Sequence, residues 1–313
     1  MSNIVFFGTS SFSVPFLRIV HKFCQDHNHC LTGVVCQPDK PSMRGQNLRE
    51  PIIKKIANEL NICVWQPEEI TFEWIDWFKK KNITIAVVVS YGRILPKNLI
   101  DAADLGFINV HASLLPRWRG ASPIQRAIEA GDSETGICII DLISKLDSGP
   151  IYYQEKIPIG ERETSEDLSN RLATLGSHAL MNILPDILQK KIKKIDQSSL
   201  GISYAHRLQK EDGLIEWNSS AIQIINKVRA MHPWPGSYTF YKNRRIKLFS
   251  AKLGNSNLKA NPGQIIEIGK KLVISTGNGQ VEFSYAQLNG KSKMPIKDLL
   301  NGFLIEVGDY LHS

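Results

Sequence analysis

The sequence predicts an α/β protein whose N-terminal domain is an open sheet with crossover helices and whose C-terminal domain is a small, OB-like β-barrel. Over residues 1–189, short apolar strands alternate with amphipathic helices, which is the pattern of a mostly parallel sheet with crossover helices. Beyond residue 206, short strands follow one another with turn residues between them, which is typical of a small barrel. We therefore expect a first domain over 1–189, a linker over 190–206 and a second domain over 207–313.

The first βα unit gives the class of the N-terminal domain. Residues 3–7 form a short apolar run that ends in the turn GTSS, and a helix is expected near 14–23. The turn holds one glycine, so the G-x-G-x-x-G fingerprint of dinucleotide binding is absent, and the chain contains no GxxxxGKS/T phosphate loop. The sequence therefore predicts the first βα unit of an α/β fold without either nucleotide motif.

The remaining elements of the first domain follow in the same alternation. Further strands are expected at 31–36, 62–65, 83–89, 106–110, 134–141 and 151–157, and helices at 51–60, 71–81, 96–103, 122–129 and 165–191. The run at 83–89, ITIAVVV, is apolar and rich in β-branched residues, which marks a central strand. Pro185 lies inside the last of these helices and is expected to break or kink it.

The segment 37–49, QPDKPSMRGQNLR, lacks apolar periodicity and is expected to be a long exposed loop. Its cations Lys40, Arg44 and Arg49 outnumber its single aspartate. That charge balance suits a flexible arm that contacts phosphates, although an ordinary solvated loop has the same composition.

The second domain combines a helix with short strands and carries nearly all of the excess positive charge. A helix is expected at 221–231 and strands at 236–241, 245–253, 263–268, 271–276 and 279–287. Residues 1–206 hold 23 Lys and Arg against 22 Asp and Glu, a net charge of +1, whereas 207–313 hold 15 against 8, a net charge of +7. A basic domain beside a neutral one suggests a polyanionic partner, nucleic acid first, with a merely basic surface as the alternative.

Cysteine usage and hydropathy indicate the compartment. The five cysteines are odd in number and contain no CxxC pair, so neither a disulfide framework nor a zinc site is expected. The N-terminus lacks the features of a signal peptide, and no window approaches the length of a membrane span. We expect a cytoplasmic protein that binds no metal and no membrane.

The stretch 109–125, NVHASLLPRWRGASPIQ, carries the densest set of reactive side chains. It follows a predicted strand and runs into a helix start, with Ser122 as N-cap and Pro123 at the first helical position. A strand, a polar loop and a helix in this order are how open α/β sheets build sites at the carboxyl ends of strands. Arg117 and Arg119 either serve a substrate or pin the loop to nearby carboxylates.

Three side chains are candidates for catalysis. Asn109 and His111 are two residues apart on the predicted strand, so they share a face. Asp147 lies in a Gly/Pro turn between two predicted strands, and if it meets His111, its carboxylate would orient the imidazole. The chain shows no signature of a covalent nucleophile, which favours direct acyl transfer between two bound substrates with N–H groups stabilising the oxyanion.

Several longer motifs carry a family resemblance. They are FxGT at 6–9, SYGRILP at 90–96, INVHASLLPRWRGASPIQRAI at 108–128, GDSETG at 131–136 and LDSGPI at 146–151. With these motifs the chain resembles the folate-dependent formyltransferases. The segments QPDKPSMRG at 37–45, SYAHRLQKEDGLIEW at 203–217 and HPWPGSY at 232–238 narrow the resemblance to members that act on methionyl-tRNA, over essentially the whole chain.

The resemblance implies transfer of a formyl group from 10-formyltetrahydrofolate to the amine of initiator methionyl-tRNA. It implies a monomer with a Rossmann-like catalytic domain and a C-terminal OB-like domain that binds tRNA. Asn109, His111 and Asp147 match the catalytic triad of the family.

The resemblance also assigns binding residues. The loop that receives the folate corresponds to Ser113, Leu114, Leu115 and Pro116. Arg44 matches the basic residue that enters the acceptor arm, and we group Lys40 and Arg49 of the same loop with it as tRNA contacts. Arg207 falls where the family often has a lysine near the tRNA end, and Ala112 stands where relatives often carry glycine.

Two other functions compete with this one. An enzyme with the same catalytic domain would formylate a sugar nucleotide or glycinamide ribonucleotide, or would hydrolyse formyltetrahydrofolate. The basic C-terminal domain and the cationic 37–49 loop argue against these. The second is a non-catalytic RNA-binding protein, and the presence of Asn109, His111 and Asp147 argues against it.

Overall fold

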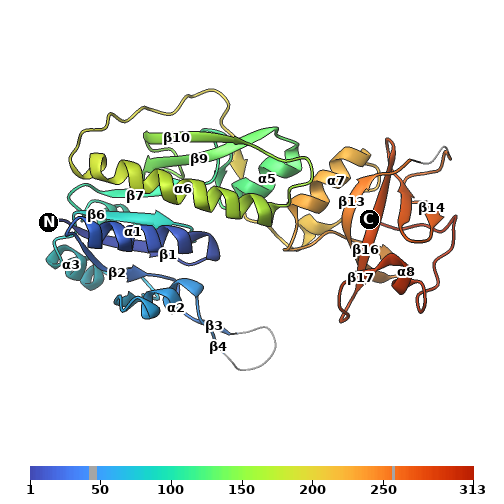
Figure 1. The fold of residues 1–313 in the computed structure, drawn as a ribbon, viewed down its shortest axis with the longest axis horizontal. Coiled ribbons are helices and arrows are strands. Elements are labelled where there is room, and N and C mark those ends of the chain that lie inside the picture. Colours follow the sequence, from blue (N-terminus) through green and yellow to red (C-terminus); the bar gives the residue numbers. More distant parts are fainter. Residues whose placement is uncertain (42–47, 256–257) are drawn as a thin grey trace. The chain divides into compact units, whose positions relative to one another are not determined.

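The computed structural model describes residues 1–41, 48–255 and 258–313, and the chain divides into two compact units (Figure 1). The first contains residues 1–123, 135–157 and 169–205, and the second contains 124–134, 158–168 and 206–313. Two short internal segments are thus grouped with the C-terminal residues, and the domain boundaries expected from the sequence stay a prediction.

The first unit is built on a seven-stranded sheet. Its spatial order is β10 (Ile151–Pro158), β9 (Glu134–Asp141), β7 (Phe107–His111), β6 (Ile85–Val89), β1 (Asn3–Gly8), β2 (Cys30–Val35) and β5 (Val64–Trp65). The strands from β5 to β7 pair in parallel, whereas β7 pairs with β9 in antiparallel fashion. Every residue of β6 is buried, as expected for a central strand. The strand order reverses beside β1, which is the doubly wound arrangement of a Rossmann-like fold.

Helices cover this sheet because their apolar faces need partners. They are α1 (Val14–Asp26), α2 (Ile52–Glu59), α3 (Phe72–Lys80), α4 (Lys97–Ile100) and α6 (Ser165–Leu188). The helix α5 (Pro123–Ala130) is grouped with the second unit from Ile124 on. α3 and α4 pack on the face to which alternate residues of β1 and β6 point, around Phe7 and Val88. α1 and α6 lie together across the sheet in Figure 1. A Cβ built on Gly176 of α6 would come within 2.8 Å of Phe16 in α1, so glycine permits this close approach.

Two expectations from the sequence are corrected by the structure. The helix α6 is not broken at Pro185 but continues to Leu188, whereas a kink there stays a prediction. Pro185 lies within the last turn. Its missing N–H removes one backbone hydrogen bond near the end of the helix, and the preceding turns keep theirs. The expected 37–49 loop is not wholly irregular either, because β3 (Lys40–Pro41) and β4 (Leu48–Arg49) pair in antiparallel fashion at its base.

The second unit holds a curled antiparallel sheet, consistent with the expected OB-like domain. Its order is β12 (Tyr238–Tyr241), β13 (Arg244–Leu253), β16 (Gln280–Leu288), β15 (Leu272–Ser275) and β14 (Ile265–Ile268), and β17 (Met294–Pro295) pairs with β16. The helices α7 (Ala221–Ala230) and α8 (Ile296–Leu299) contribute to the same apolar core. α7 begins with a capping box between Ser220 and Gln223.

The C-terminal segment links the two edges of this curled sheet. His312 exchanges backbone hydrogen bonds with Phe240 of β12, at 3.0 and 2.8 Å. Leu311 N donates to the Gly263 carbonyl, just before β14, at 2.8 Å. Because each edge strand presents unpaired N–H and C=O groups, this segment satisfies both edges and closes the gap between them.

A buried hydroxyl holds this closure in place. Thr239 is fully buried, and its Oγ1 accepts from Nε1 of Trp217 at 3.0 Å and donates to the His312 carbonyl at 2.8 Å. Removing that oxygen leaves a buried indole N–H without its partner and weakens the attachment of the C-terminal segment.

We predict that Thr239→Val lowers the free energy of unfolding of the second unit by about 1–3 kcal/mol, the usual cost of an unsatisfied buried polar group. Urea unfolding followed by tryptophan fluorescence should show a lower midpoint. Thr239→Ser keeps the hydroxyl and is expected to unfold closer to the wild-type midpoint. A Val variant as stable as the wild type would contradict the bridging role.

Candidate active site

The end of β7 supplies the first two polar side chains of the candidate site. Asn109 pairs in register with Val88 of β6 and with Ile140 of β9, and His111 lies opposite Cys138. Strands on both sides therefore fix the backbone of β7. Because Asn109 and His111 alternate with Val110, their side chains project from the same face.

The third side chain comes from the turn between β9 and β10. Asp141 N donates to the Pro150 carbonyl at 2.9 Å and closes the base of this turn. Gly149 allows the two arms to touch, since a Cβ there would lie 1.9 Å from the Asp141 carbonyl oxygen. Asp147 itself has a φ of 41°, in the left-handed region that aspartate tolerates better than most residues.

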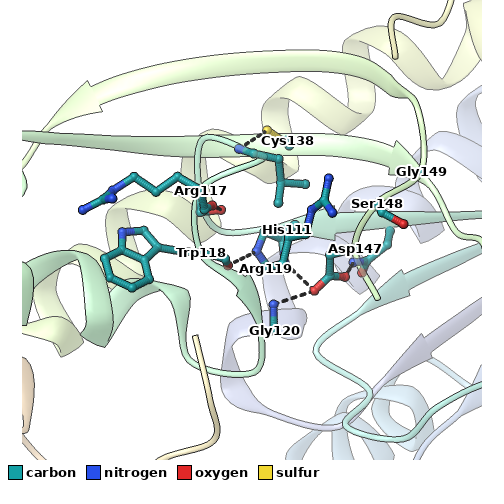
Figure 2. Close-up of polar contacts among 12 residues, drawn as sticks. His111, Arg117, Trp118, Arg119, Gly120, Cys138, Asp147, Ser148 and Gly149 are labelled. Carbon is teal, nitrogen blue, oxygen red and sulfur yellow. Dashed lines mark hydrogen bonds and ion pairs between the residues drawn. The ribbon is translucent and has the colours of Figure 1, made fainter. Parts of the chain in front are cut away.

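The three side chains meet at the Asp147 carboxylate. Figure 2 shows His111 and Gly120 beside it. Asn109 Nδ2 donates to Oδ1 at 3.3 Å, and His111 Nδ1 lies 3.6 Å from Oδ2. The Gly120 N–H also donates to Oδ2, at 2.8 Å. The side chains of His111 and Asp147 are only 6% and 9% exposed, so these contacts form in a largely water-free environment. The catalytic role of this group stays a prediction.

The tautomer of the neutral His111 ring follows from its second contact. Nε2 lies 2.9 Å from the Trp118 carbonyl oxygen. A carbonyl only accepts, so Nε2 carries a hydrogen and Nδ1 is the nitrogen that faces Asp147. A second proton on Nδ1 would complete an ion pair with the carboxylate. Trp118 has a φ of 64°, which lets the loop turn its carbonyl back toward the ring.

The loop from Ser113 to Pro116 is braced from the inside. Ser113 is fully buried, and its hydroxyl donates to the Arg117 carbonyl at 2.6 Å. Leu115 is also buried and packs with Cys138 and Ile140. Leu114 and Pro116 are half-buried, so these two residues offer the side-chain surface of the loop.

Two polar groups of the neighbouring strands hold the backbone of Leu115. Its N–H donates to Cys138 Sγ at 3.4 Å, and Gln154 Nε2 donates to its carbonyl at 3.2 Å. Gln154 also contacts the sulfur, at 3.2 Å. Burial raises the pKa of the Cys138 thiol to about 11, so the group stays neutral at ordinary pH. The loop therefore rests on an uncharged support.

The two arginines of the segment have different surroundings. Arg119 is 4% exposed, and its Nε and Nη2 donate to Gln197 Oε1 at 3.2 and 2.7 Å. Arg119 therefore holds the loop in place, which was one of the two roles considered for it. Its partner in these two bonds is the amide of Gln197 and not a carboxylate. Arg117 is exposed, and its guanidinium lies 4.4 Å from the centre of the Trp118 ring.

The expected tRNA contacts are spread over both units. Lys40 and Arg49 are exposed on the paired strands β3 and β4, and Lys40 Nζ donates to Gln37 Oε1 at 2.8 Å. Arg207 is exposed in the second unit. Arg44 lies outside the described residues. The structure leaves the role of all four cations a prediction.

Neither a metal-binding cluster nor a membrane-spanning helix occurs in the described part of the chain. Among these residues, no three His, Cys, Asp or Glu side chains are arranged to hold a metal ion. Likewise, none of the described helices combines the length and apolarity needed to cross a bilayer.

Sequence reasoning overlooked the groups that hold the triad. The Gly120 N–H and the Trp118 carbonyl are backbone atoms, which no residue type reveals. Gln197 lies in a Lys- and Ser-rich segment without periodicity. The signal that the sequence offered was a single glutamine in this segment, but the partners of its amide depend on the fold.

Domain families match both parts of the chain. Residues 2–184 match the Formyl transferase family, and residues 207–304 match its C-terminal domain. The methionyl-tRNA formyltransferase of Sulfurihydrogenibium sp. is 37% identical over 311 residues, covering 98% of this chain and 99% of that protein. The methionyl-tRNA formyltransferase of Thermodesulfovibrio yellowstonii is 38% identical over 308 residues, covering 98% of each chain.

Solved structures share the fold at lower identity. An N-formyltransferase from Helicobacter canadensis, in complex with folinic acid and dTDP-3-aminofucose, aligns with a TM-score of 0.68 at 18% identity. The alignment covers 92% of this chain and all of that one. A sugar 3N-formyl transferase crystallised with dTDP and 5-N-formyl-THF gives a TM-score of 0.67 at 20% identity, covering 93% and 99% of the two chains.

We predict that the thiol supporting the loop is chemically inert in the folded protein. Burial raises the pKa of Cys138 and Cys36 to about 11 and that of Cys24 to about 12. At pH 8 a thiol with a pKa near 11 is only about 0.1% thiolate, and the thiolate is the reactive form. Cys63 is exposed and should therefore be alkylated first by iodoacetamide.

Mass spectrometry of the alkylated peptides measures this order. After unfolding in urea, all five cysteines should react at similar rates, which controls for differences between peptides. Modification of Cys138 as fast as Cys63 in the folded protein would show that the loop opens frequently.

Proposed function

The chain belongs to the formyl transferase family, and from that membership we propose that it formylates the methionine amine of initiator methionyl-tRNA, using 10-formyltetrahydrofolate as donor. The observation that carries this proposal is the similarity to methionyl-tRNA formyltransferases over 98% of the chain at 37% identity. The high positive charge of residues 207–313 supports a nucleic-acid substrate.

The reaction joins two bound substrates without a covalent enzyme intermediate. The methionine amine attacks the formyl carbon, and the carbonyl electrons move to the oxygen to form a tetrahedral intermediate. The intermediate collapses when the bond from this carbon to N10 of the folate breaks. One proton leaves the amine and one is taken up by N10, so the step is balanced and needs no oxidant or metal as co-reactant.

We assign the charge stabilisation to Asn109 and His111. One hydrogen of the Asn109 amide is directed at Asp147, and the amide nitrogen carries a second that would serve the oxyanion. His111 would carry positive charge when protonated on Nδ1, next to the carboxylate. Donors held in place before the reaction need no reorganisation as charge develops, which makes their contribution large.

We assign positioning and proton relay to Asp147. Its Oδ2 lies 3.6 Å from His111 Nδ1 and accepts the Gly120 N–H, so the carboxylate holds the ring from the protein side. An α-amine whose carboxyl group is acylated, as at a peptide N-terminus, titrates near pH 7.7–8.0, so it needs little help to lose a proton. The carboxylate would pass that proton toward the leaving nitrogen.

The folate would rest against the loop from Ser113 to Pro116. Leu114 and Pro116 are the half-buried members and offer apolar surface, whereas the Ser113 hydroxyl is already bonded within the loop. We therefore propose packing contacts, and not a serine hydrogen bond, as the contribution of this loop.

Formylation of a small amine is the competing activity, since sugar N-formyltransferases share the fold. Their identity to this chain is 18–20%, which bears on fold alone, whereas the relatives named for methionyl-tRNA exceed 35%. Formyl transfer assayed on charged initiator tRNA, charged elongator tRNA and a dTDP-amino sugar tests the proposal. Preference for the amino sugar would overturn it.

We predict that His111→Ala and Asp147→Asn each lower kcat by about 100-fold or more, because each removes stabilisation made mainly in the transition state. Binding of initiator methionyl-tRNA should stay within a few-fold of wild type. Single-turnover formylation and a filter-binding assay measure the two quantities. Near-normal turnover in either variant would remove that residue from the proposed mechanism.

We predict that affinity for tRNA falls steeply with salt, because each contact between a cation and a phosphate releases counterions. Lys40→Ala combined with Arg49→Ala should weaken tRNA binding and reduce the slope of log K against log[salt] by about one for each phosphate that is no longer neutralised. Lys79→Ala is the matched control, since this exposed lysine lies in the last turn of α3. An unchanged slope in the double variant would mean that Lys40 and Arg49 do not contact tRNA phosphates.

A further inference from the structure

One residue of the segment after α6 differs from its neighbours. From Lys193 to Leu200 every residue is exposed except Gln197, which is half-buried. A flexible polar side chain loses rotamer freedom when it is ordered, so its burial here needs compensating contacts.

Those contacts use the whole side-chain amide. Gln197 Nε2 donates to the carbonyls of Asp147 and Gly149, both at 2.8 Å. Its Oε1 accepts two N–H groups from Arg119, at 3.2 and 2.7 Å. Both amide hydrogens and both lone pairs of the oxygen are therefore engaged, which is the full capacity of a glutamine.

The nitrogen and the oxygen of the amide bind two different segments near the Asp147 carboxylate. On one side, the paired carbonyls belong to the turn that carries Asp147. On the other side, Arg119 immediately precedes Gly120, whose N–H donates to Asp147 Oδ2. Gln197 therefore links the backbone of Asp147 to the segment that binds its side chain.

The conformation of Asp147 needs such support. Its φ of 41° places it in the left-handed region, which costs a non-glycine residue of the order of 1 kcal/mol. The turn is otherwise exposed over its first half, from Ile143 to Leu146. The two hydrogen bonds, to the carbonyl of Asp147 itself and to that of Gly149, hold the backbone that directly follows the Asp147 Cα.

We infer that Gln197 is a positioning residue for the proposed formyl transfer, which it serves by fixing the Asp147 turn. The expected effect on the rate rests on the proposed function. The restraint of the Asp147 turn by Gln197 does not depend on it. A displacement of about 1 Å at a reacting group can reduce a rate by two orders of magnitude. Gln197 makes no direct contact with the Asn109 or His111 side chains among the described hydrogen bonds, so it acts through Asp147.

Substitutions separate the two halves of the amide. Gln197→Ala removes all four bonds, whereas Gln197→Glu keeps acceptors for Arg119 but places a carboxylate oxygen against two carbonyls. Both variants should lose about 10- to 100-fold in kcat with KM for tRNA unchanged within two-fold. Ser199→Ala, an exposed neighbour, is the matched control and should retain wild-type kcat. Full activity of Gln197→Glu would show that only the arginine contact matters and would overturn the inference.

A double-mutant cycle distinguishes positioning from general destabilisation. If Gln197 acts through Asp147, adding Gln197→Ala to Asp147→Asn should cost less than about three-fold further in single-turnover rate. An equal fold-loss in both backgrounds would mean independent effects and would overturn the inference. Gln197→Glu is close in size to glutamine and serves the same cycle if the alanine variant does not fold.

Hydrogen exchange gives a readout that does not require activity. In Gln197→Ala, backbone amides of residues 142–149 should exchange faster, while those of β6 stay protected. Unchanged exchange in the turn would overturn the inference. If wild-type protein shows no formylation, the proposed function fails, yet the exchange data still report whether Gln197 holds the turn, so the two failures are distinguishable.

Discussion

The site depends on how the Asp147 carboxylate is satisfied. A charge with a side chain only 9% exposed needs hydrogen-bond donors or an ionic partner, because desolvation would otherwise oppose folding. Asn109 supplies a donor to Oδ1, Gly120 supplies one to Oδ2, and the His111 ring faces Oδ2. The carboxylate thus ties together a strand end, the segment that follows it and a turn from another part of the sheet.

The sheet makes that meeting possible through the direction of one strand. β7 runs parallel to β6, so Asn109 and His111 follow the rule that sites gather at the carboxyl ends of parallel strands. β9 runs the other way and pairs Asp141 with Ile108, so the next turn begins one residue from Asn109 in register. From there, the turn after β9 carries Asp147 to the Asn109 amide and the His111 ring.

Local support lies outside the reacting groups. The Leu115 backbone rests on the Cys138 thiol and the Gln154 amide, and the Asp147 turn rests on the Gln197 amide. These supports are neutral, so they hold the loops without adding a charge that would compete with the carboxylate for the His111 ring. In the second unit, Leu311 and His312 of the C-terminal segment form backbone hydrogen bonds with both edges of the sheet.

The sequence by itself predicted most of the helices and strands of the sheet and named the candidate side chains of the site. Apolar periodicity located β6, and the spacing of Asn109 and His111 placed both on one face, because these patterns report local burial. Only the tertiary structure decided that Asp147, 38 residues from Asn109, would reach it, and that Gln197, 50 residues farther along than Asp147, would hold the turn. Such contacts depend on strand direction, register and backbone atoms, which residue types do not encode locally. The sequence also did not reveal that α6 continues through Pro185. This proline lies in the last turn, so the hydrogen bond that it cannot make is lost close to the end of the helix.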